Sequence, residues 1–130
     1  MKPKVIILED DEGLRDLMTE ILEDENVETH GFNDGMSALE HLKHESMPQV
    51  VIIDLKLPDM DPMAFRDNFS RLPGSDQASF IVASGSAQIE EWAQKLNAVT
   101  YLKKPYDIDI FTMTVMSVID SKNLTNSSLS

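Results

Sequence analysis

Acidic, hydroxyl and basic side chains stand directly after four short apolar runs of this sequence. In chain order these positions are Glu9 to Glu12, Asp54, Ser84, and Lys103 with Lys104. A carboxylate nucleophile, further carboxylates for a divalent cation, a hydroxyl and an ammonium would together suit phosphoryl transfer, whose catalysis is mainly positioning and charge neutralisation. Taken alone, each has an ordinary explanation, such as an acidic first helical turn, a turn Ser or a solvated Lys. Their meaning depends on whether the fold brings them together.

Asp54 has the clearest position, because it ends the apolar run Val50 to Ile53. A short run rich in β-branched residues predicts a strand buried on both faces, and Pro58 with the following residues to Pro62 supplies a turn. Asp54 therefore lies at the carboxyl end of a strand, where ligands collect in open α/β sheets. The alternative is an Asp that only caps the turn.

Short apolar runs alternate with segments of helical period along the chain, which predicts βα units around a parallel sheet. The predicted strands are Val5 to Leu8, Val27 to Phe32, Val50 to Ile53, Phe80 to Ala83 and Val99 to Leu102. The second run mixes polar with apolar residues, as an exposed edge strand would.

Five helices are predicted between and after these strands. The first buries the stripe Leu14, Leu17, Met18, Ile21 and Leu22 and exposes Glu12, Arg15, Asp16, Glu20 and Glu23. The second is capped by Asn33 or Asp34 and buries Met36, Leu39 and Leu42; the third starts at Pro62 after the cap Asp61 and buries Phe65, Phe69 and Leu72. The fourth contains Ile89, Trp92, Ala93 and Leu96, and the fifth runs from about Asp107 to Asp120.

The strand order 2-1-3-4-5 of the flavodoxin-like fold is favoured, because right-handed crossovers then cover both faces of the sheet. Strands 1 and 3 become neighbours, so at least two acids from Glu9 to Glu12 approach Asp54. Clustered carboxylates repel one another unless a cation sits among them. All-oxygen ligation with room for water and phosphate is what Mg²⁺ prefers.

Composition limits the class of protein. The chain has 130 residues and 42% hydrophobic content, enough for one domain. We expect that domain to span residues 1–120, followed by a polar, loose tail over residues 121–130. A net charge of −12 argues against binding nucleic acid or an anionic membrane, and no cysteine is available for disulfides or thiol chemistry. The four apolar residues near the N-terminus are too few for a signal peptide, which favours a cytoplasmic location.

From Lys4 to Asp120 the chain resembles the receiver domain of two-component response regulators. The resemblance rests on four separated motifs in the family's order: the acidic run after the first strand, Asp54, Ser84 before Gly85, and Lys104 before Pro105. It implies that Asp54 is the phosphoacceptor, that Ser84 and Lys104 contact the phosphoryl group, and that Glu9, Asp10 and Asp54 bind Mg²⁺, with Asp11 as an accessory acid.

Two further roles come only from the resemblance. The backbone carbonyl of Lys56 matches the family's main-chain metal ligand, and Tyr101 matches the aromatic residue whose ring turns inward on phosphorylation together with Ser84. By sequence alone, a residue such as Tyr101 is more often an ordinary sheet aromatic. The chain departs from the family at Pro62, where a Gly is usual, so the loop before it is expected to differ in shape.

The resemblance implies a signalling domain that accepts a phosphoryl group from a histidine kinase or phosphotransfer protein, rather than an enzyme beyond self-phosphorylation and autodephosphorylation. One alternative is a phosphatase of the haloacid dehalogenase type, but Lys56 stands where that family needs a second Asp. Another is a pseudo-receiver that binds partners without phosphate, although neither the acids nor Lys104 have been lost.

The output is expected to be a contact with a protein or a second copy through helix 4, strand 5 and helix 5. In the fifth helix the stripe Ile108, Phe111, Val115 and Val118 or Ile119 suffices to cover the sheet. This leaves Ile110, Met113 and Met116 for a contact surface. The alternative is a wider buried face on the same helix.

Overall fold

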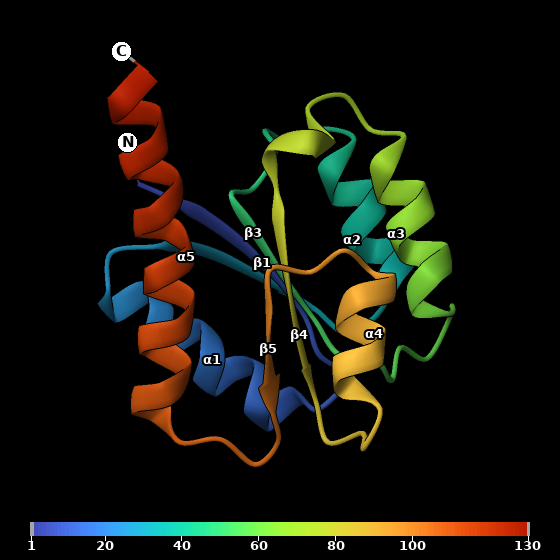
Figure 1. Cartoon of the computed structure of the whole chain (residues 1–130). Coiled ribbons are helices and arrows are strands. Elements are labelled where there is room, and N and C mark those ends of the chain that lie inside the picture. The colour runs from blue at the N-terminus through green and yellow to red at the C-terminus, as the bar shows by residue number, and fades with distance from the viewer. Residues whose placement is uncertain (1, 130) are drawn as a thin grey trace.

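Strands and helices alternate along the chain in a computed structural model that describes the backbone of residues 2–129 and the side chains of residues 2–122 (Figure 1). The strands are β1 (Lys4–Leu8), β2 (Glu28–Phe32), β3 (Val50–Ile53), β4 (Ser79–Ser84) and β5 (Thr100–Lys103). The helices are α1 (Glu12–Asp24), α2 (Gly35–Leu42), α3 (Pro62–Ser70), the 3₁₀ turn η1 (Ser75–Gln77), α4 (Ile89–Lys95) and α5 (Ile108–Leu129). All five predicted βα units are present.

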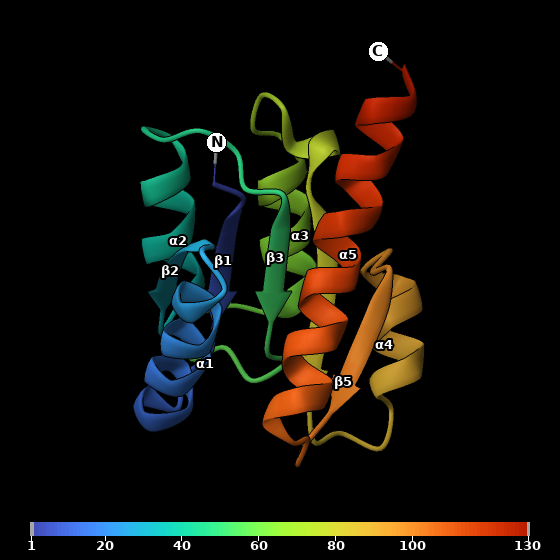
Figure 2. The same cartoon turned by 90° about the vertical axis from the view of Figure 1, so that its left-hand side faces the viewer.

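The five strands form one parallel sheet in the order β2-β1-β3-β4-β5, which confirms the flavodoxin-like prediction (Figure 2). Every residue of β1 and β3 is buried, whereas β2 and β5, at the edges, have one buried residue each, Thr29 and Leu102. This difference follows from position, since central strands of a parallel sheet are covered on both faces.

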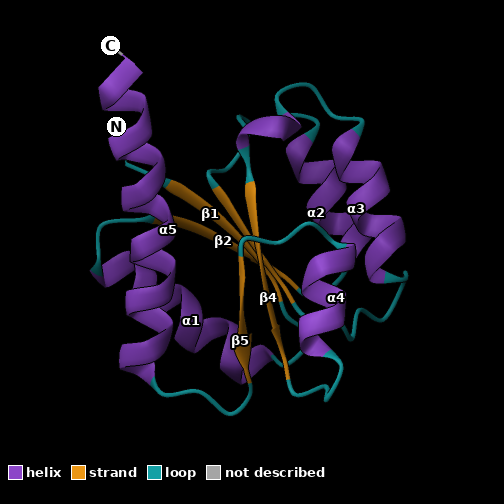
Figure 3. Ribbon diagram, in the orientation of Figure 1, coloured by secondary structure: helices purple, strands orange, loops and turns teal. Residues whose placement is uncertain are grey.

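Helices cover both faces of the sheet (Figure 3). Helices α1 and α5 lie on one face, where Met18, Leu22, Phe111 and Val115 pack against alternate residues of β1, β3 and β4. Helices α2, α3 and α4 lie on the other face, over the remaining residues of the same strands. The sheet is therefore held between two hydrophobic cores that cover its central strands on both faces.

Aspartate caps fix where three helices begin. The side chains of Asp11, Asp34 and Asp61 accept hydrogen bonds from the backbone N–H groups of Leu14, Ser37 and Met63. Such caps satisfy N–H groups that have no partner inside the helix. Asp34 and Asp61 confirm the predicted helix starts.

Three side chains predicted to face the core are instead exposed. Met36 is 58% exposed, because α2 turns Gly35, Ala38, Leu39 and Leu42 toward the sheet and leaves its second residue outside. Leu17 is 42% exposed at the margin of the α1 stripe, whose centre is Met18 and Leu22. Ile108 is 53% exposed, because the buried stripe of α5 starts only at Phe111.

Helix α5 continues to Leu129, whereas the sequence predicted its end near Asp120 and a loose tail. The residues after Asp120 are polar but include no Pro or Gly, so nothing in the local sequence stops the helix. The domain boundary near residue 120 stays a prediction. Within residues 2–129, neither α5 nor any other helix combines the length and the apolar character needed to cross a membrane.

Candidate functional site

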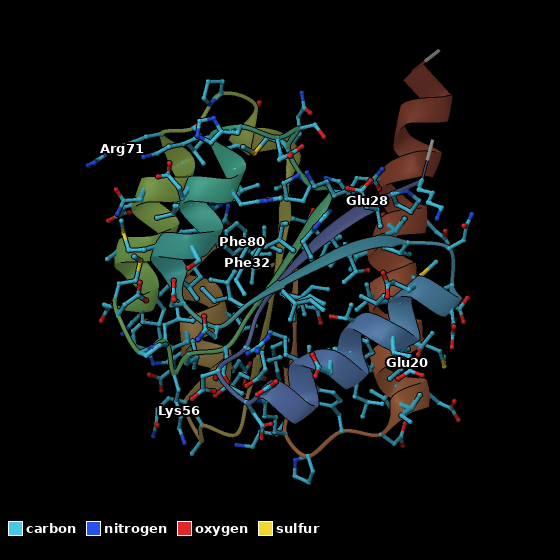
Figure 4. All side chains as sticks on the ribbon, turned by 180° about the vertical axis from the view of Figure 1, so that it is seen from behind. Glu20, Glu28, Phe32, Lys56, Arg71 and Phe80 are labelled. Atoms are coloured by element: carbon cyan, nitrogen blue, oxygen red, sulfur yellow. The ribbon has the colours of Figure 1, made fainter. Side chains whose placement is uncertain are left out.

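The residues singled out in the sequence emerge at one end of the sheet. In the strand register Leu8 lies beside Ile53, and Ser84 lies beside Lys103. The next residues along β1, β3 and β5 therefore leave the sheet at the same end, the carboxyl end of the strands. Figure 4 shows Lys56 at this end, with Glu28, at the start of β2, toward the opposite end.

Three carboxylates lie close together at this end of the sheet. Glu9, Asp10 and Asp54 each offer an oxygen, and these oxygens lie within 4.8 Å of one another. Glu9 and Asp54 are buried, while Asp10 is exposed. A compact set of carboxylate oxygens with one open side suits a hard cation that keeps part of its water, as Mg²⁺ does. The site thus fits the metal that the sequence predicts.

Asp11 has a different position from these three acids. Its side chain accepts the N–H of Leu14 at 3.1 Å and so caps α1, while its own N–H donates to Glu9 Oε2 at 3.2 Å. Asp11 therefore contributes to the site through its backbone, by orienting the carboxylate of Glu9. Its predicted role as an accessory acid stays a prediction.

The ammonium of Lys104 bridges two of the acids. Its Nζ lies 2.7 Å from Glu9 Oε1 and 2.9 Å from Asp54 Oδ2. Burial lowers the pKa of Lys104, but the hydrogen bonds to both carboxylates outweigh it and leave the pKa above its ordinary value. Lys104 therefore carries a full positive charge between two buried carboxylates.

Burial also controls the charge of Glu9. Loss of water around this carboxylate raises its pKa from 4.5 to about 7, with Asp54 acting in the same direction and Lys104 opposing it. In the absence of a metal ion, Glu9 thus changes charge near neutral pH. A divalent cation among the acids would favour its ionised form.

Backbone and neighbouring groups hold the two buried acids in place. Asp54 Oδ1 accepts the N–H of Lys56 at 3.1 Å. The guanidinium of Arg15 donates to the backbone carbonyl of Glu9 at 2.8 Å, although the sequence placed Arg15 on the outer face of its helix. Helical period gave no signal for this contact, because it indicates which face of α1 is buried but not that a side chain reaches back six residues to the end of β1.

Ser84 and Tyr101 occupy different environments. Ser84 is buried at the end of β4, its Oγ accepts the N–H of Ser86 at 3.1 Å, and its carbonyl accepts the N–H of Lys104 at 2.8 Å. Tyr101 lies on β5 with 39% of its surface exposed, and its side chain faces outward rather than into the acid cluster. The structure thus joins Ser84 to Lys104 through the backbone and leaves the Tyr101 ring accessible.

Tyr106 is a residue near the site that sequence reasoning missed. Its ring stacks on Phe111 at a centroid distance of 5.8 Å, and its hydroxyl donates to Met18 Sδ at 3.6 Å. Burial raises the pKa of Tyr106 to about 12, so it stays neutral beside the charged groups. The sequence signal that could have identified Tyr106 is its position two residues after Lys104.

The loop after Asp54 closes without a left-handed residue. Pro62 is the first residue of α3, Asp61 before it has φ −67°, and the positive φ values in the described chain occur at Asn26, Gly74 and Asn97. Asp59, also missed from sequence, reaches from this loop to the start of α2. The loop is therefore anchored on a neighbouring helix, while its expected difference in shape from the family's loop stays a prediction.

Comparisons with known proteins agree with this geometry. A family model for the response regulator receiver domain matches residues 5–115. Sporulation initiation phosphotransferase F of Bacillus subtilis is 28% identical over 84% of this chain and 87% of its own length. The transcriptional regulatory protein CrdR of Helicobacter pylori is 31% identical over 84% of this chain but only 51% of its own length. A solved receiver domain from Methylobacillus flagellatus matches with a TM-score of 0.78 at 26% identity, over 91% of this chain and 99% of that one.

Proposed function

The chain belongs to the response regulator receiver family, whose members are signalling domains, and we propose that Asp54 accepts a phosphoryl group from the phosphohistidine of a kinase or phosphotransfer protein. The observation that supports this most directly is the buried Asp54 carboxylate, 2.9 Å from the ammonium of Lys104 and within reach of two further acids. A carboxylate so placed lies beside the exposed Asp10, on the accessible side of the acid cluster, and is surrounded by groups that stabilise added negative charge.

The transfer forms one bond and breaks one. An oxygen of Asp54 attacks the phosphorus, the phosphorus–nitrogen bond of the donor histidine breaks, and the electron pair of that bond returns to the imidazole. The product on this chain is an acyl phosphate. Lys104 and the hydroxyl of Ser84 would hold the oxygens of the phosphoryl group, while the N–H of Lys56 keeps Asp54 oriented.

Glu9, Asp10, Asp54 and the backbone carbonyl of Lys56 are the residues that we propose as ligands of Mg²⁺. The carboxylate oxygens within 4.8 Å of one another support the first three. Bound there, Mg²⁺ supplies charge neutralisation between the acids and the phosphoryl oxygens. A phosphatase of the haloacid dehalogenase type is not favoured, because the exposed Lys56 side chain cannot replace its general acid.

The experiment that tests this proposal is modification by a small phosphodonor followed by intact mass. Addition of one phosphoryl group is expected in the presence of Mg²⁺, and chelation of the metal is expected to stop it, because the acid cluster then repels the donor. Modification that is equal with and without chelator would remove Mg²⁺ from the mechanism. A chain that is never modified would instead be a pseudo-receiver.

We further propose that the output surface comprises α4, β5 and the exposed side of α5, and that it binds a downstream protein or a second copy. Tyr101, Ile110 and Met113 are 39%, 49% and 66% exposed on this side. Met116, which the sequence assigned to the same surface, packs partly against the core and is left out. The net charge of −12 favours protein partners over nucleic acid or anionic membrane.

Replacing both Ile110 and Met113 with Lys is expected to weaken association by about tenfold or more, while phosphorylation of Asp54 continues unchanged. The reason is that two apolar contacts, each worth about 1–2 kcal/mol in an interface, are replaced by charges. Light scattering and pull-down with the phosphorylated and unphosphorylated chain measure the effect. Met36→Lys, an equally exposed Met on α2, is the matched control. Unchanged association in both phosphorylation states would place the output surface elsewhere.

A further inference from the structure

Asp59 joins the loop after β3 to the beginning of α2. Its Oδ1 accepts the N–H of Gly35 and its Oδ2 accepts the N–H of Met36, each at 2.9 Å. Gly35 lies 24 residues away in the sequence, so this is a tertiary contact rather than a local cap. Both carboxylate oxygens are used, and they bind N–H groups that have no partner inside their helix.

Close packing supports the same contact. A Cβ at Gly35 would lie 2.6 Å from the Sδ of Met60, so the side chain of the residue after Asp59 packs directly against the helix start and would have to move to admit one. Asp34, by contrast, caps α2 from within by accepting the N–H of Ser37 at 2.7 Å. The start of α2 is thus held by one local acid and by one acid from the loop.

These contacts restrain the backbone that includes Lys56. At one end, Asp54 follows β3 directly and binds the N–H of Lys56. At the other end, Asp59 and Met60 are fixed on α2, and Pro58 restricts the residue before it to extended conformations. Lys56 therefore lies in a short loop segment that is anchored at Asp54 and at Asp59. Its side chain is exposed, and both anchors restrict its backbone.

We propose that Asp59 is a positioning residue that holds the backbone carbonyl of Lys56 in place for the metal site. This inference rests on the proposed function, since it takes Lys56 as a main-chain ligand of Mg²⁺. Asp59 touches neither the acid cluster nor Lys104 and acts only through the loop. Groups that orient metal ligands typically change metal affinity by about tenfold when they are removed.

Asp59→Ala is expected to weaken Mg²⁺ binding by about tenfold, measured from NMR shifts during a titration with Mg²⁺ alone. It is also expected to speed hydrogen exchange at the amides of Gly35 and Met36, which lose their acceptors. Asp59→Asn should give an intermediate affinity, because its side-chain oxygen still accepts one of the two bonds whereas its NH₂ group cannot accept the other.

Asp34→Ala is the matched control. It removes one negative charge and one cap from the same helix start, but it leaves the loop anchored, so Mg²⁺ affinity is expected to stay within about twofold of the parent chain. Equal weakening in Asp34→Ala and Asp59→Ala would assign the effect to charge and overturn the inference. Parent-like affinity in Asp59→Ala would also overturn it, whereas a parent chain that binds no Mg²⁺ would instead remove the proposed metal site itself.

Discussion

Asp54→Asn is expected to abolish phosphoryl modification of the chain, whereas Asp76→Asn is expected to be modified like the parent. An Asn amide lacks the charged oxygen that attacks phosphorus, yet it has nearly the same shape and can still accept the N–H of Lys56. Asp76 is an exposed acid in η1, remote in sequence from every acid of the site, and controls for the general effect of removing a carboxylate.

The measurement is intact mass after incubation with a small phosphodonor and Mg²⁺, with far-UV circular dichroism to establish that each variant is folded. Complete loss in a folded Asp54→Asn chain would agree with Asp54 as the acceptor. Modification of that variant to the parent's extent would contradict the assignment, and the exposed Asp10 would become the candidate nucleophile.

Lys104→Met is expected to lower the free energy of unfolding by about 3 kcal/mol at pH 8 in the absence of Mg²⁺, the cost of leaving buried charges without their partner. Glu9 and Asp54 are both buried, and Lys104 supplies the ammonium between them. Methionine keeps an apolar stem of similar length, so the change removes mainly the charge. Lys103→Met is the matched control, because Lys103 is exposed and its ammonium donates to the carbonyl of Ser86 rather than to a buried acid.

At pH 5 the loss in Lys104→Met is expected to be clearly smaller. The folded-state pKa of Glu9 is about 7, above its ordinary value of 4.5, so the stability linked to its protonation is present at low pH and is lost as the pH rises through 7. Lys104 lowers the pKa of Glu9, so its removal raises that pKa further and extends the loss of stability to higher pH. Urea unfolding at both pH values measures the difference, and an equal loss at pH 5 and pH 8 would indicate lost packing instead of charge.

The architecture was predictable from the sequence because its signals are local. Val50 to Ile53 is a run of apolar residues that only a central strand buries on both faces, and Asp34 and Asp61 have the composition of helix caps. The handedness of crossovers then favoured the strand order, which predicts that at least two acids from Glu9 to Glu12 approach Asp54, and the resemblance to receiver domains singles out Glu9 and Asp10 among them.

The features that the sequence did not predict depend on geometry that no periodic pattern encodes. The Asp59 contact with Gly35 exists because α2 begins beside the loop after β3, and no local pattern encodes that proximity. Arg15 likewise follows the helical period of a solvent-facing residue, yet its guanidinium reaches the carbonyl of Glu9. The predictions that Met36 and Ile108 are buried were wrong, because helical period indicates which side of a helix is buried but not at which residue the buried stripe begins or ends.

Helix α5 has a mechanical consequence that follows from its length. It begins at Ile108, close after Lys104, and runs along the sheet to project beyond it (Figures 1 and 2). With 22 residues it is a rod of about 33 Å, at about 1.5 Å per residue. It packs on the sheet through Phe111, Val115 and Ile119. Val115, in the middle of this buried stripe, is the point about which the helix would turn. A tilt of about 5° about Val115 would move the far end, about 21 Å away, by roughly 2 Å, which is about twice the displacement at the first residue of the helix, since Ile108 is seven residues from Val115 and Leu129 is fourteen.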